Sequence, residues 1–131
     1  MKEPISIDIF SGDILLGNSF PLSLIRRPVS IRPFPAEELR RLLKDTALHS
    51  FWGHGNTLRV ASQWLGVDLT PKMERPVIVL SSDGFPQLDA LIFRKCYILS
   101  PDYRQGFRPA IGAEVSENDI VNWTALEMIW E

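Results

Sequence analysis

The chain holds a single cysteine, Cys96, so no disulfide can form within it, and such cysteine usage is typical of a reducing compartment. It contains no apolar run long enough to cross a bilayer. Its formal net charge is only −2, which gives no general attraction to nucleic acids or membrane surfaces. These absences predict a cytoplasmic protein without a membrane or a long nucleic acid as its partner. Any anionic ligand would then need a local binding site.

Several catalytic signatures are also missing. The sequence has no paired cysteines, no His-Glu-x-x-His and no close group of carboxylates, so we expect neither a metal site nor a cofactor. It lacks the Gly-x-Ser-x-Gly turn of hydrolases that use a serine nucleophile. It also lacks the Gly-x-x-x-x-Gly-Lys loop of nucleoside triphosphatases. These enzyme classes are therefore disfavoured.

What remains is the composition of a globular domain. With 131 residues, of which 45% are hydrophobic, the chain is expected to form one domain, residues 1–131, around a single core. Apolar runs and alternating patterns predict strands within residues 5–9, 13–16, 29–32, 77–80, 88–93 and 123–130. Helical patterns lie between them, which predicts an α/β fold with a mixed sheet flanked by helices.

The clearest predicted helix follows Pro35, which suits the first helical position. Leu39, Leu42 and Leu43 are expected to form the stripe that faces the core.

A second helix is predicted at about residues 57–65, with Asn56 as its N-cap. Its core face should include Trp64, which the spacing makes a core residue rather than a ligand platform. Residues 116–119 look like another helix start, and residues 100–112, rich in Arg, Pro and Gly, are predicted to form a loop.

One segment stands apart, and it reads Ser50-Phe51-Trp52-Gly53-His54-Gly55-Asn56-Thr57. It runs from a strand-like stretch, through a histidine between two glycines, into a helix. Glycines permit close approach of a ligand, and a helix N-terminus favours an anion such as phosphate. Beside an anion, the His54 imidazolium is stabilised and can donate a proton to a leaving oxygen. A plain strand-to-helix turn fits the same residues, and His49, the other histidine, is expected to be structural.

A phosphodiester bound at residues 53–57 can be cleaved without a metal if it belongs to RNA. The ribose 2′-hydroxyl attacks its own phosphate when it is held in line with the leaving oxygen. The protein then has to supply position, charge stabilisation and a proton for the departing 5′-oxygen. His54 is the proton donor in this hypothesis.

Five short motifs occur in a recognisable order over roughly residues 12 to 130. They are Leu16-Gly17-Asn18-Ser19-Phe20, Trp52-Gly53-His54-Gly55-Asn56-Thr57, Trp64-Leu65-Gly66-Val67, Met73-Glu74-Arg75-Pro76-Val77 and Asp89-Ala90-Leu91-Ile92-Phe93. This order resembles that of the anti-CRISPR ring nucleases, a family of small viral and prokaryotic proteins. Their pattern is Leu-x-Asn-Ala-Phe, Ile-Gly-His-x-Ser/Thr-Thr, Leu-x-Gly, Asn-Arg-Val and a strand that ends in Arg-Leu-x-Glu-Gly.

The resemblance implies a homodimer of mixed α/β subunits that binds cyclic tetra-adenylate across its interface. It also implies cleavage by 2′-hydroxyl attack without a metal, which silences type III CRISPR signalling. Carried over by motif, His54 is the general acid, and the ligand-binding residues are Asn18, Asn56, Thr57, Arg75 and Arg94.

The chain departs from the family at the final motif. Ile98 stands at the position of the family's arginine, and Asp102 is nearest to the place of its glutamate. An arginine there would stabilise transition-state charge, so its loss favours a second hypothesis, a protein that binds and sequesters the messenger without cleaving it. A third hypothesis is a protein-interaction module that keeps the fold, because the four tryptophans would also suit an interface.

Overall fold

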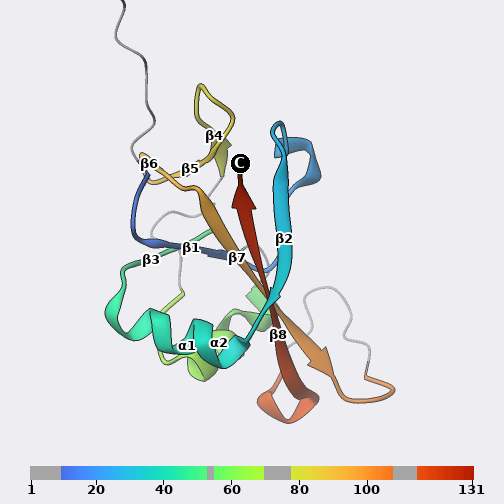
Figure 1. Ribbon diagram of the computed structural model, residues 1–131. Helices are drawn as coiled ribbons and strands as arrows, with labels where there is room; N and C mark the ends of the chain where they lie inside the picture. Colours follow the sequence, from blue (N-terminus) through green and yellow to red (C-terminus); the bar gives the residue numbers. More distant parts are fainter. Residues whose placement is uncertain (1–9, 53–54, 70–77, 108–114) are drawn as a thin grey trace, which may run out of the picture.

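Two β-sheets and two α-helices make up the described part of the computed structural model, which comprises residues 10–52, 55–69, 78–107 and 115–131 (Figure 1). The helices are α1 (Ala36–Asp45) and α2 (Gly55–Leu65), and two short 3-10 helices are η1 (Leu22–Leu24) and η2 (Glu117–Asp119). The strands are β1 (Ile14–Gly17), β2 (Val29–Phe34), β3 (Leu48–Ser50), β4 (Val79–Leu80), β5 (Pro86–Leu88), β6 (Leu91–Ile92), β7 (Lys95–Tyr103) and β8 (Ile120–Trp130).

The main sheet is mixed and has the strand order β2-β8-β7-β1-β3. β1 lies parallel to both β3 and β7, whereas β8 is antiparallel to β7 and β2. A second, three-stranded antiparallel sheet has the order β4-β5-β6. The predicted α/β class with a mixed sheet and flanking helices is therefore confirmed.

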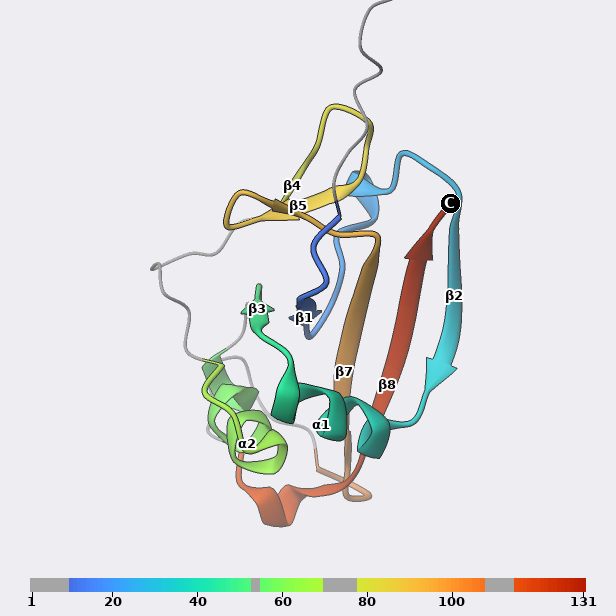
Figure 2. The same ribbon diagram turned by 60° about the vertical axis from the view of Figure 1, so that its left-hand side comes forward.

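Each face of the main sheet carries its own hydrophobic cluster. Figure 2 shows α1 and α2 on the same face, where they pack on the side chains of Leu16, Tyr97, Leu99 and Ala125. The opposite face, with Leu15, Cys96, Ile98, Met128 and Trp130, packs against residues of the three-stranded sheet. Alternate residues of each strand point to opposite faces, so the apolar residues of β7 and β8 serve both clusters.

Two details of the predicted α1 were wrong. The helix begins at Ala36, and Pro35 is its N-cap in an extended conformation rather than its first helical residue. Leu39 and Leu43 are buried, but Leu42 is 38% exposed. The reason is helical geometry, because successive residues are turned by about 100°, and this takes Leu42 away from the face that Leu39 and Leu43 share.

The second helix starts earlier than expected. α2 begins at Gly55, so Asn56 is inside the first turn and is not the N-cap. The predicted core face is confirmed at Ala61 and Leu65, which are buried, while Leu58 and Trp64 are partly buried against the same cluster.

The strand predictions for residues 13–16, 29–32 and 123–130 are confirmed by β1, β2 and β8. The run 88–93 is not one strand, because Asp89 and Ala90 form a turn between β5 and β6 with φ of 53° and 64°. Of residues 77–80 the structure shows β4 at Val79–Leu80, and residues 5–9 lie outside the described residues.

The expected helix start at residues 116–119 is the short 3-10 helix η2, whose Ser116 and Asp119 form a capping box. The loop expected from Ser100 begins only after Tyr103, where β7 ends. No helix among the described residues is long and apolar enough to cross a membrane.

Candidate functional site

The candidate site lies where β1 and β3 end side by side. The two strands are parallel with Leu16 opposite Ser50, and the Phe51 amide donates to the Leu16 carbonyl at 2.9 Å. Asn18 follows the end of β1 directly, and α2 starts at Gly55, five residues beyond the end of β3. Because parallel strands end at the same edge of a sheet, this register places Asn18 level with the chain that leads into α2.

α2 begins five residues after β3 ends, so its positive end follows this edge of the sheet along the chain. The first turn of the helix contains no acidic residue, so no carboxylate within it neutralises the partial positive charge of this helix end. This end of the helix therefore favours an anion.

At the end of β1, the backbone of Gly17 lies against the ring of Phe51. A Cβ atom at Gly17 would lie less than 3.0 Å from three atoms of the Phe51 ring, so only glycine fits there. Phe51 is buried and meets Phe20 edge-on, with ring centroids 6.1 Å apart. The Leu-Gly-Asn part of the first motif therefore has a packing reason at its glycine.

A buried hydrogen bond ties the segment after β3 to the first turn of α2. The indole N–H of Trp52 donates to the hydroxyl of Thr57 at 3.2 Å, and the two residues are 3% and 5% exposed. Thr57, predicted to bind the ligand, is thus a buried residue that anchors the start of the helix from within. Its hydroxyl already accepts a hydrogen bond from protein.

Replacing Thr57 with valine should lower the free energy of unfolding by about 1–2 kcal/mol, because the buried indole N–H of Trp52 loses its acceptor while the volume at position 57 is kept. Thr57→Ser, which retains the hydroxyl, is the matched control for the hydrogen bond. Urea unfolding followed by tryptophan fluorescence measures both variants. A valine variant as stable as the wild type would contradict a stabilising role of this hydrogen bond.

The predicted general acid, His54, and one predicted ligand-binding residue, Arg75, lie outside the described residues. Asn56 is in the first turn of α2. The structure thus places Asn18 level with the chain that leads into the helix start, where Asn56 and Thr57 lie.

Arg94 lies at the other end of the sheet. It immediately precedes β7, whose register pairs Tyr97 with Leu16, so Arg94 is near the start of β1 and not near its end. Its guanidinium donates to the Trp130 carbonyl at 3.0 Å and lies over the Phe10 ring.

Asp102 lies beyond the end of β1, near the end of β7, and accepts a hydrogen bond from the Thr124 hydroxyl at 2.8 Å. It alternates in phase with Cys96 and Ile98, which places it on the sheet face opposite to α2. Ile98, at the position of the family's arginine, is 8% exposed and belongs to the core on that same face. Residue 98 therefore supplies packing and no charge.

A buried ionic cluster, which the sequence reasoning missed, lies on the helix-bearing face. Glu127 on β8 is 2% exposed, and it accepts hydrogen bonds from the Tyr97 hydroxyl and the Arg32 guanidinium, both at 2.7 Å. Burial by itself would raise the pKa of Glu127, but the hydrogen bonds from Tyr97 and Arg32 outweigh it and lower that pKa. Burial, followed by the hydrogen bond to Glu127, raises the pKa of Tyr97. The cluster joins β2, β7 and β8 and is structural.

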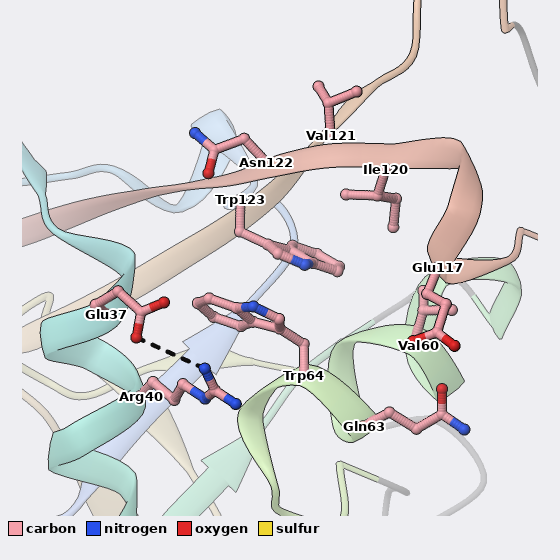
Figure 3. Close-up of a pocket in the computed structure, with 10 residues that line it drawn as sticks. All are labelled: Glu37, Arg40, Val60, Gln63, Trp64, Glu117, Ile120, Val121, Asn122 and Trp123. Atoms are coloured by element: carbon pink, nitrogen blue, oxygen red, sulfur yellow. Dashed lines mark ion pairs between the residues drawn. The ribbon is translucent and has the colours of Figure 1, made fainter.

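A separate pocket of about 420 Å³ lies between α1, α2 and the start of β8 (Figure 3). Trp64 and Trp123 stack in it with ring centroids 5.7 Å apart, and the Arg40 guanidinium lies 5.1 Å from the Trp64 ring centroid while facing Glu37. Trp64 is thus both a core residue, as predicted, and part of a pocket wall. Its ring contacts Trp123 and Arg40, so one of these neighbours would have to move before a ligand could stack on that part of the ring.

The described residues contain no group of three or more His, Cys, Asp or Glu side chains arranged to hold a metal ion. The chain matches no protein-family model, and the search of curated proteins gave no significant match either.

Proposed function

We propose that the protein binds a cyclic oligoadenylate at the edge where β1 and β3 end, as a divergent relative of the ring nucleases. The observation that supports this most is the register that puts Asn18 level with the chain entering α2. A polar amide and a helix N-terminus at one sheet edge suit a phosphodiester, because the amide offers hydrogen bonds and the helix end favours negative charge. By analogy with the family, the working unit is a homodimer.

In the cleavage reaction that we propose, the 2′-hydroxyl group gives its proton to water as its oxygen attacks the adjacent phosphorus. The bond from phosphorus to the 5′-oxygen breaks, which leaves a 2′,3′-cyclic phosphate on one side and a 5′-hydroxyl on the other. His54, as an imidazolium, gives the departing 5′-oxygen its proton. No metal takes part, and the helix end stabilises charge on the phosphate.

Binding without cleavage is the second candidate function, and one observation favours it. Ile98 is buried in the core on the face away from α2, so residue 98 contributes nothing to transition-state charge. Such a protein would lower the free concentration of the messenger by sequestering it.

The test incubates the protein with cyclic tetra-adenylate in EDTA, and measures bound ligand and linear product separately. For an enzyme, His54→Ala should slow cleavage about 100-fold while binding persists, because only the proton transfer is lost. Asn18→Ala should weaken binding, whereas Asn118→Ala, at an exposed asparagine of η2, should not.

Each outcome assigns one function. Cleavage that His54→Ala slows about 100-fold supports the enzyme, and binding without product supports the sequestering protein. If wild type neither binds nor cleaves cyclic tetra-adenylate, the proposal is wrong and a protein-interaction role remains.

A further inference from the structure

The second histidine, His49 on β3, links three parts of the molecule. One ring nitrogen, Nε2, lies 2.9 Å from the carboxylate of Asp13, directly before β1. The other, Nδ1, lies 3.0 Å from the carboxylate of Asp89, in the turn between β5 and β6. The His49 side chain is only 12% exposed, and its ring contacts that of Phe93. The main sheet and the three-stranded sheet therefore meet at one imidazole.

The geometry requires a charged ring. A carboxylate only accepts hydrogen bonds, and a neutral imidazole has a single N–H, so it can satisfy only one of the two carboxylates. The imidazolium donates from both nitrogens and satisfies Asp13 and Asp89 at once. Loss of the proton leaves one carboxylate facing a nitrogen lone pair, which is repulsive.

The turn that carries Asp89 is strained. Asp89 and Ala90 both have positive φ, a conformation that glycine adopts freely and that alanine disfavours. Such a turn persists only when surrounding contacts hold it. The contact from His49 to Asp89 is one of these.

We propose that His49 is a pH-dependent latch that, as an imidazolium, holds the β5–β6 turn against the start of β1 and releases it when the ring loses its proton. This inference is independent of the proposed function. It assigns the latch to three side chains: Asp13, His49 and Asp89. The β5–β6 hairpin then remains attached through its apolar contacts and the hydrogen bond from the Ser11 amide to the Ile92 carbonyl.

The charged surroundings agree with this assignment. Among the described residues, Asp89 and Asp13 are the charged groups that contact the ring. Across a cavity of about 310 Å³ that Asp13 also lines, the charged side chains are those of Arg94 and Lys95. Burial lowers the pKa of His49, but the hydrogen bonds and charges of Asp89 and Asp13 outweigh it, so its pKa is raised above 6.5. The latch is thus complete below pH 6.5 and is lost as the pH rises through the raised value.

Amide hydrogen exchange tests the latch. The Ser11 amide donates to the Ile92 carbonyl at 2.7 Å, across the junction that the latch closes, and therefore reports on its opening. After correction for intrinsic exchange, the equilibrium constant for opening at Ser11 should increase between about pH 5.5 and about pH 9. This increase should be roughly tenfold for each unit by which the pKa of His49 is raised. The Trp130 amide, bonded to the Arg94 carbonyl in the main sheet, is the reference.

Two variants separate the latch from other causes. His49→Gln cannot titrate, so the opening at Ser11 should no longer depend on pH. Ala90→Gly relieves the strained φ, and it should reduce opening at every pH while the pH dependence stays. The proposal is overturned if wild type shows no pH dependence at Ser11, or if His49→Gln keeps it. Direct titration of the ring by NMR must also give a pKa above 6.5, and an ordinary or lowered value overturns the proposal as well.

Discussion

Arg32→Met is expected to lower the free energy of unfolding by about 3 kcal/mol at neutral pH, because it leaves a buried carboxylate without its countercharge. The Glu127 side chain is 3% exposed and accepts from the Arg32 guanidinium, while the Tyr97 hydroxyl occupies its other oxygen. Methionine keeps the unbranched stem of residue 32 on the sheet surface, so packing changes little. Urea unfolding at several pH values measures the effect.

The pH dependence of that loss identifies its cause. With Arg32 present the pKa of Glu127 is below its ordinary value of 4.5, so its stabilisation is present above that value and is lost as the pH falls through the lowered pKa. Without the guanidinium, two of the causes that lower the pKa of Glu127 are lost while burial still raises it, so this pKa should be higher in Arg32→Met than in wild type. The Glu127 carboxylate of the variant then takes up a proton on mild acidification. The difference in the free energy of unfolding between Arg32→Met and wild type should therefore become smaller.

Two controls accompany Arg32→Met. Adding Glu127→Gln removes the uncompensated charge and should restore part of the lost stability, since the amide oxygen still accepts from Tyr97. Arg41→Met, at an exposed arginine 3.5 Å from Glu38, should cost less than about 0.5 kcal/mol. A loss at Arg32 that equals the loss at Arg41 would contradict the buried-charge explanation.

Gly17→Val should destabilise the protein by about 3 kcal/mol, and it should also disturb the candidate site. The new side chain would collide with the ring of Phe51, which is itself buried and held by Phe20. Either the ring leaves its place or the ends of β1 and β3 separate, and both changes displace Asn18 from the chain that enters α2. The melting temperature and the affinity for the ligand should therefore fall together.

Gly12, the glycine before β1, provides the control for Gly17→Val. Gly12 has open space where its Cβ would be, so Gly12→Val should have little effect on stability. If the collision with Phe51 causes the loss, Phe51→Ala should cost less in the Gly17→Val background than in wild type, because the added methyl groups take up part of the vacated space. Additive losses would show that the two residues act separately.

Much of the fold could be predicted because some patterns are local. The alternation in residues 123–130 gave β8 and its two faces correctly, since period-2 alternation depends on neighbours along the chain alone. The run 88–93 was misread because Asp89 and Ala90 form a left-handed turn without glycine, and their conformation depends on contacts that sequence does not display. Leu42 was misassigned because three leucines in five residues do not reveal where the apolar stripe ends.

The site was predictable only in part for the same reason. Asn18 and the start of α2 came from motif order, and their proximity follows from the parallel pairing of β1 and β3. The cluster of Arg32, Tyr97 and Glu127 joins residues up to 95 positions apart, so no local spacing indicates it. His49 likewise gave no signal, because its partners come from 36 and 40 positions away.

The place of β8 has a consequence for synthesis on the ribosome. β8 lies between β2 and β7, so residues 29–34 gain their strand partner only when residues 120–130 emerge. Until then β2 is an unpaired, six-residue edge of a nascent chain, and such edges promote aggregation. Pro33 in that strand lacks a backbone N–H, which makes the unpaired edge a poorer template for pairing with another chain.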